Sequence, residues 1–222
     1  MKFFQPQRLI TVMLIISGLL LSSGCGEQVA PGRAVYMLMD TSGTYTQQLQ
    51  KAQMIINYLL GTLDSGDSLA VARIDSGSFS EKDIVAKVTF DDRPSYANQQ
   101  KRHFQQAVKS AVGKVRPSQY TDITGGMLQA AEFLNEKNPG EKIILIFSDL
   151  QEDIKKGYIR NIPLKLGKFE VVALNVTKLR RDNVDPRKYM GRLEMWRKRV
   201  ESGGGQWRVI NNLDHIERIL HG

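Results

Sequence analysis

Apolar runs and amphipathic stretches alternate along the chain from residue 33 onward. "RAVYMLMD" (33–40) and "EKIILIFSD" (141–149) are almost continuously apolar, which is typical of strands buried on both faces of a sheet. Shorter apolar or alternating runs predict further strands at 67–75, 83–90, 169–176 and 206–210. Helical spacing of apolar residues, with glycine or proline near the ends, predicts helices at 47–63, 95–113, 126–137, 185–202 and 213–220.

This order of elements predicts the fold class. Strands that alternate with helices indicate an α/β fold with a doubly wound, mostly parallel central sheet and helices on both faces. The strand at 83–90 alternates apolar and polar residues, so we expect it to lie antiparallel at an edge of the sheet. About 190 residues form one domain of ordinary size, which we place at 33–222.

The N-terminal segment has a different character. Lys2 and Arg8 precede an apolar run at 9–21. This run is shorter than the roughly 17–25 residues of a membrane-spanning helix, but it suits the core of a signal peptide. We therefore predict a signal peptide at 1–24, followed by a short tether at 25–32 that leads into the domain.

Cys25, the only cysteine, follows "LSSG" at the end of this signal. The stretch resembles the lipobox of bacterial lipoproteins, although Ser22 stands where that motif usually carries leucine. The resemblance implies lipidation of Cys25, which would also explain an unpaired thiol in an exported protein. Gly26 in place of aspartate favours the outer membrane on its periplasmic side. The alternative is an ordinary secretory signal with an incidental cysteine.

The chain is basic, with a formal net charge of +8. Much of the excess lies at 178–199. Because the signal peptide predicts export, we expect no nucleic-acid partner. The charge is typical of a solvated helix face, and attraction to anionic lipid head groups is the alternative.

Five oxygen-bearing side chains lie where strands give way to loops. Asp40 and Asp149 each end an apolar run, Ser42 and Thr44 follow Asp40, and Thr121 precedes the helix at 126–137. In a doubly wound sheet, the carboxyl ends of the strands carry the functional site. Oxygen ligands without histidine or cysteine suit Mg²⁺, Mn²⁺ or Ca²⁺ rather than Zn²⁺.

Three motifs, in this order, resemble the von Willebrand factor A domain. "DTSGT" (40–44) is similar to its Asp-x-Ser-x-Ser motif, "YTDITGG" (120–126) to the segment that carries its threonine, and "ILIFSDL" (144–150) to the strand that ends in its last aspartate. The resemblance covers essentially all of 33–220. Thr44 departs from the family's usual serine, keeping the hydroxyl but adding a methyl group.

This resemblance implies a metal-ion-dependent adhesion site and no enzymatic activity. Ser42, Thr44 and Thr121 would contact a Mg²⁺ ion through hydroxyls, while Asp40 and Asp149 would act mainly through bound water. A protein partner would supply a carboxylate to the incompletely neutralised ion. The domain would thus bind a protein or acidic ligand at the cell envelope.

Asp75, Ser76 and Asp122 lie near neighbouring strand ends. They could contribute to a rim around the site that contacts the partner, or they could serve only in turns and local hydrogen bonds.

Two other functions remain open at this stage. "DTSGT" also resembles the aspartyl-phosphate segment of ion pumps and, more loosely, of haloacid-dehalogenase phosphatases, with Asp40 as the nucleophile of a Mg²⁺-dependent phosphatase or phosphotransferase. However, Thr41 stands where the pumps carry lysine, and Asp149 is not followed by their Gly-Asp pattern. The other alternative is a metal-free scaffold with the same fold.

Overall fold

The computed structural model describes residues 30–43, 45–75 and 77–220. The predicted signal peptide, Cys25 and most of the tether lie outside these residues, as do Thr44 and Ser76. Within the described ranges, the helices are too short or too polar to cross a membrane.

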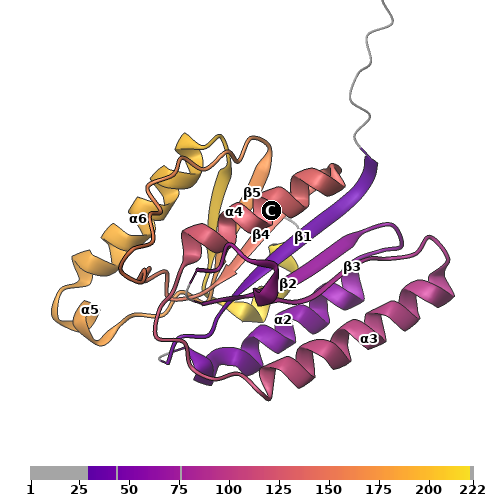
Figure 1. Ribbon diagram of the computed structural model, residues 1–222, viewed down its shortest axis with the longest axis horizontal. Helices are drawn as coiled ribbons and strands as arrows, with labels where there is room; N and C mark the ends of the chain where they lie inside the picture. Colours follow the sequence, from indigo (N-terminus) through magenta and orange to yellow (C-terminus); the bar gives the residue numbers. More distant parts are fainter. Residues whose placement is uncertain (1–29, 44, 76, 221–222) are drawn as a thin grey trace, which may run out of the picture.

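Six strands form one sheet in the order β3-β2-β1-β4-β5-β6 (Figure 1). Neighbouring strands pair in parallel, except that β3 lies antiparallel to β2 at the edge. The predicted fold class is therefore confirmed. The strands are β1 (Ala30–Asp40), β2 (Ser68–Ile74), β3 (Ile84–Thr89), β4 (Pro139–Phe147), β5 (Phe169–Leu174) and β6 (Gln206–Ile210).

Helices cover both faces of this sheet, with α2 and α3 on one face and α4 and α6 on the other (Figure 1). Two short elements differ from the sequence prediction. The C-terminal helix is a 3₁₀-helix, and α5 was not predicted because its five residues show no periodicity. The helices are α2 (Leu49–Thr62), α3 (Pro94–Val112), α4 (Ile123–Lys137), α5 (Arg180–Val184) and α6 (Pro186–Ser202), with 3₁₀-helices η1 (Thr46–Gln48), η2 (Glu81–Asp83) and η3 (Leu213–Ile219).

Strand β1 lies in the middle of the core. Its side chains alternate between two apolar clusters, one under α2 and α3 and the other under α4 and α6. This is why every position from 34 to 39 is apolar. The first cluster receives Val35, Met37 and Met39, and the second receives Ala34, Tyr36 and Leu38.

The winding of the chain reverses between β1 and β4. From β1 the chain moves outward to β2 and β3, and it then returns to the other side of β1 as β4. The parallel register pairs Met39 with Phe147, so the two strands end level with each other. Asp40 and the residues after Phe147 therefore lie at the same edge, at the switch point where α/β sheets bind ligands.

Helix α4 approaches β1 closely, and this approach positions the loop that carries Thr121. A Cβ atom on Gly126 would lie 2.8 Å from Leu38 Cδ2. Gly126 leaves this space to the end of the Leu38 side chain, which packs directly against the backbone of the helix.

Replacing Gly126 by alanine should force Leu38 or α4 to shift. We expect a loss of about 1–3 kcal/mol in the free energy of unfolding, as for overpacked cores, measured by urea denaturation. The matched control is Gly191→Ala in α6, where an added methyl group meets no atom within 4 Å. That variant should gain about 0.5–1 kcal/mol through helix propensity. Equal effects at the two positions would contradict the close packing of α4 on β1.

Candidate metal site

Asp40 ends β1 and is completely buried. One carboxylate oxygen accepts a hydrogen bond from the Ser42 N–H at 2.8 Å, and the other accepts one from the Ser148 hydroxyl at 2.6 Å. Burial raises the pKa of Asp40, and the hydrogen bonds from Ser148 and Ser42 offset part of that rise. The carboxylate thus joins the turn after β1 to the turn after β4.

Asp149 follows the end of β4 in a sharply turned segment. The next residue, Leu150, has a φ of 62°, a left-handed backbone conformation that residues other than glycine rarely adopt. Side chains hold this turn: the Leu150 N–H donates to the Ser148 hydroxyl at 3.0 Å, and the Arg192 side chain donates to the Asp149 carbonyl at 3.0 Å. Asp149 itself accepts from the Gln151 N–H at 2.8 Å.

Thr121 is fixed by backbone hydrogen bonds to the segment after β4. Its N–H donates to the Asp153 carbonyl at 2.7 Å, and the Asp153 N–H donates back at 3.0 Å. The same loop is tied to the turn after β1, because the Ser118 N–H donates to the Thr41 carbonyl at 2.8 Å. Three loops from distant parts of the sequence are therefore joined at one edge of the sheet.

A cavity of about 640 Å³ opens between these loops, and we call it the site cavity. Three of the five predicted ligands line it, namely Ser42, Thr121 and Asp149. Asp40 is not among the lining residues, but it is hydrogen-bonded to Ser42. Thr44, the fifth, lies outside the described residues. The remaining wall consists of Gly43, Ser118, Gln119, Gln151, Asp153, Leu179 and Arg180.

The donor set of the site cavity fits a hard divalent cation. Ser42 and Thr121 offer hydroxyl oxygens and Asp149 offers a carboxylate, which are the ligand types that Mg²⁺ and Ca²⁺ prefer. Among the described residues, no group of three or more histidine, cysteine or acidic side chains could hold a metal ion. A cation here would therefore depend on hydroxyl ligands, as the sequence resemblance implies.

The residues predicted for the rim have different positions. Asp75 accepts a hydrogen bond from the hydroxyl of Ser118, which lines the site cavity, so Asp75 lies one side chain away from it. Ser76 lies outside the described residues. Asp122 is completely buried, which favours the alternative of local hydrogen bonding over a place in the rim. The reason is local: α4 begins at Ile123, and Asp122 is its N-cap, accepting from the Gly125 N–H at 2.8 Å.

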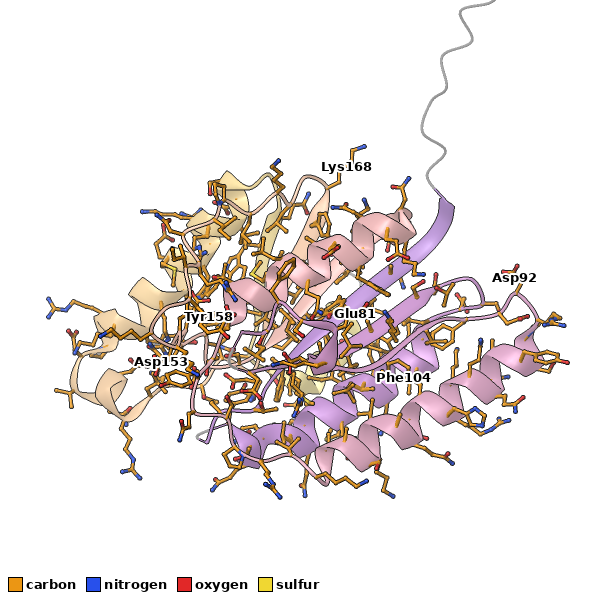
Figure 2. All side chains as sticks on the ribbon, in the orientation of Figure 1. Glu81, Asp92, Phe104, Asp153, Tyr158 and Lys168 are labelled. Atoms are coloured by element: carbon orange, nitrogen blue, oxygen red, sulfur yellow. The ribbon has the colours of Figure 1, made fainter. Side chains whose placement is uncertain are left out.

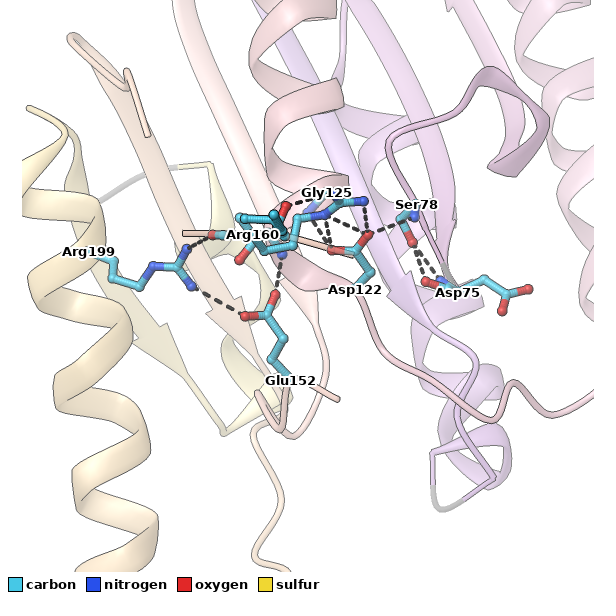
Figure 3. A network of polar contacts seen from close by, with 9 residues as sticks. Asp75, Ser78, Asp122, Gly125, Glu152, Arg160 and Arg199 are labelled. Carbon is cyan, nitrogen blue, oxygen red and sulfur yellow. Dashed lines mark hydrogen bonds and ion pairs between the residues drawn. The ribbon is translucent and has the colours of Figure 1, made fainter. Parts of the chain in front are cut away.

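Asp122 also holds two loops together (Figure 3). Its carboxylate forms an ion pair with Arg160 at 2.7 Å and accepts from the Ser78 N–H at 3.1 Å. Nearby, Glu152 accepts from the Thr124 N–H at 2.6 Å and pairs with Arg199. The network fixes the loop between β4 and β5 beside Thr121.

That loop spans 148–168 without a helix or strand, and it runs past Asp153 in the wall of the site cavity to Lys168 before β5 (Figure 2). Long irregular loops in compact domains are commonly functional. This loop lacks the backbone hydrogen bonds of a helix or strand, and side-chain hydrogen bonds hold it instead. Sequence reasoning missed three residues that make such bonds, Ser148, Arg160 and Arg192. Only Ser148, directly before Asp149 in "FSDL", lies inside a motif that could have indicated it.

The geometry does not favour Asp40 as a nucleophile. A nucleophilic carboxylate must reach the substrate, but Asp40 is buried and both of its oxygens accept hydrogen bonds. Nor is Asp40 among the lining residues of the site cavity. Its contacts instead suit a residue that orients Ser42.

Comparison with solved structures finds von Willebrand factor A domains. A von Willebrand factor type A protein from Catenulispora acidiphila is 15% identical, with a TM-score of 0.55, over 85% of this chain and 41% of that chain. The conserved hypothetical protein BatB from Bacteroides thetaiotaomicron is 14% identical, with a TM-score of 0.52, over 85% of this chain and 95% of that chain.

The pilus adhesin SpaC from Lactobacillus rhamnosus GG is 13% identical, with a TM-score of 0.51, over 87% of this chain and 30% of that chain. This chain therefore spans less than half the length of two of these three proteins. No family model matches the sequence, and no curated protein does. The likeness shows the fold, which is of the von Willebrand factor A type.

The buried carboxylate of Asp40 predicts a pH dependence in the absence of divalent cations. Because its folded-state pKa is raised above the ordinary 3.8, the folded state binds the proton more tightly than the unfolded state does. The free energy of unfolding should therefore fall as the pH rises from about 4 through the raised pKa. The slope from this one group is at most about 1.4 kcal/mol per pH unit.

Asp40→Asn is the matched variant, because an amide can accept from the Ser42 N–H and donate to the Ser148 hydroxyl. In urea denaturation with EDTA at a series of pH values, Asp40→Asn should lack the fall in the free energy of unfolding that titration of Asp40 causes. At neutral pH it should be at least as stable as the native chain. Parallel plots of the free energy of unfolding against pH for the two proteins would contradict the raised pKa of Asp40.

Proposed function

We propose that the domain binds a protein partner through a divalent cation held in the site cavity. The observation that carries this proposal is the convergence of Ser42, Thr121 and Asp149 on one cavity at the switch point of the sheet. The partner contributes a carboxylate, and no covalent bond is broken.

The residues have distinct roles in this proposal. Ser42, Thr121 and Thr44 hold the cation through hydroxyls, and Asp149 carries negative charge to the same cavity. Asp40 orients Ser42 through the hydrogen bond between them. Mg²⁺ is the expected ion, with Mn²⁺ or Ca²⁺ as alternatives. When bound, the cation would supply a coordination position for a carboxylate oxygen, because neutral hydroxyls leave much of its charge unbalanced.

Fold-level analogy adds limited support. SpaC is named a pilus adhesin, so a fold of this type occurs in a protein that attaches to other molecules. Because one fold hosts many functions, the proposal depends on the site cavity rather than on the analogy. The burial of Asp40 supports binding over phosphoryl transfer.

We also propose that the domain is attached to the cell envelope through a lipid on Cys25, on the periplasmic side of the outer membrane. The lone cysteine after an apolar signal segment motivates this part of the proposal. Only four residues, 26–29, separate Cys25 from Ala30, where β1 begins. At roughly 3.3 Å per residue they would hold the domain close to the membrane surface.

Calorimetric titration of Mg²⁺ into the purified chain tests the ion site. The native chain should bind one ion, and Ser42→Ala should weaken its affinity by about tenfold or more, because a ligand is lost. The matched control is Gln119→Ala, which removes a polar side chain from the same cavity at an exposed position not assigned to the cation. Gln119→Ala should bind Mg²⁺ like the native chain.

Equal heats from the native chain and Ser42→Ala would contradict this ligand set. Absence of any binding of Mg²⁺, Mn²⁺ or Ca²⁺ would instead favour a metal-free scaffold with the same fold.

Replacing Cys25 by serine tests the anchor. We expect the native chain to fractionate with membranes and to incorporate radiolabelled palmitate in a bacterial host. Cys25→Ser should lose the label and move to the soluble fraction, because the lipid would be attached through this thiol. A chain that stays membrane-bound and unlabelled after this change would contradict the lipid anchor.

A further inference from the structure

One positive side chain stands among the described residues that line the site cavity. Arg180, the first residue of α5, is exposed and lines the cavity together with Ser42, Thr121 and Asp149. The ion pairs found among the described residues do not include Arg180. The other charged residues of this wall, Asp149 and Asp153, are acidic.

A buried ion pair fixes α5 relative to the candidate metal site. Asp182 of α5 is almost completely buried and binds the guanidinium of Arg192 through both carboxylate oxygens, at 3.1 and 2.8 Å. The same Arg192 side chain donates to the carbonyl of Asp149 at 3.0 Å. Arg192 thus links α5 directly to the turn that carries Asp149.

Asp182 also shapes the turn that presents Arg180. Its carboxylate accepts from the Leu179 N–H at 2.8 Å, and its own N–H donates to the Leu179 carbonyl at 2.9 Å. The backbone directly before Arg180 is therefore held by a residue that is itself tied to Asp149 through Arg192. These contacts fix the backbone from which the Arg180 side chain reaches the wall of the cavity.

The size of the cavity exceeds what one carboxylate needs. A volume of about 640 Å³ lies in the range of pockets that hold whole small molecules, roughly 300–1,000 Å³. A segment that brings one carboxylate to the cation would extend along the wall. A guanidinium there favours a second carboxylate, because its planar donors match both oxygens.

We propose that Arg180 is a second anchor for the partner, whose bound segment carries two acidic groups, one for the cation and one for Arg180. This inference rests on the proposed function and specifies the chemistry of the partner. It assigns to Arg192 and Asp182 the role of positioning residues.

Labelled, end-capped peptides test the proposal by fluorescence anisotropy with the full chain in detergent, in Mg²⁺ and in EDTA. One peptide carries a single aspartate, and a series carries two aspartates separated by increasing numbers of glycines. In Mg²⁺, the native chain should bind the best-spaced two-aspartate peptide about tenfold more tightly than the single-aspartate peptide, as for a charge-assisted hydrogen-bonded pair.

Arg180→Gln should abolish this difference while it binds the single-aspartate peptide and Mg²⁺ itself like the native chain. Lys188→Gln, which removes the same charge from an exposed position on α6, should keep the difference. Circular dichroism of both variants checks that they are folded.

The outcomes separate this inference from the function on which it rests. If single-aspartate binding depends on Mg²⁺ but two aspartates give no advantage, or an advantage that survives in Arg180→Gln, the role of Arg180 is overturned alone. If no peptide binds in a Mg²⁺-dependent way, the proposed function is overturned together with it.

Discussion

The hydrogen bonds of one buried carboxylate organise the functional edge of this domain. Asp40 accepts from the Ser42 N–H with one oxygen and from the Ser148 hydroxyl with the other, so it joins the ends of the two central strands. Ser148 in turn accepts from the Leu150 N–H and stabilises the turn that displays Asp149. A shift of the Asp40 carboxylate would therefore move both sides of the site cavity. The level ends of β1 and β4, set by their parallel register, make this bridge possible.

A part-buried and a buried ion pair extend this organisation to the outer loops. Asp122 with Arg160 holds the loop between β4 and β5, and Asp182 with Arg192 holds α5. Removing one partner of a buried pair such as Asp182 with Arg192 typically costs about 3–5 kcal/mol, because the other charge is left buried and alone. The basic excess late in the chain is therefore only partly a solvated helix face: Arg192 is structural, whereas exposed pairs such as Arg187 with Asp185 contribute little.

The sequence was sufficient for the fold and for the placement of Asp40 and Asp149, because continuous apolar runs predict buried strands and parallel strands bring their carboxyl ends together. It was insufficient for the contacts that orient the site. Ser148 and Asp40 are 108 residues apart, and a side-chain hydrogen bond over that separation leaves no local pattern. The role of Asp122 stayed open between the rim and local hydrogen bonding for a related reason: α4 begins at Ile123, earlier than its apolar periodicity indicates, so the sequence did not identify Asp122 as the capping residue.

The electrostatics of Asp40 bear on the choice between a metal-free scaffold and a cation site. Burial disfavours its charged form, and hydrogen bonds from Ser148 and Ser42 only partly offset that effect. In a scaffold with no ion, a neutral amide could also bridge the two turns, accepting from the Ser42 N–H and donating to the Ser148 hydroxyl, without the cost of a buried charge. A nearby divalent cation reverses this balance, because opposite charge favours the ionised carboxylate. Under the proposed function, a positive ion above the junction of β1 and β4 would account for an ionisable side chain at this buried position. Such an ion, held largely by neutral hydroxyls, would keep enough charge to attract an acidic partner.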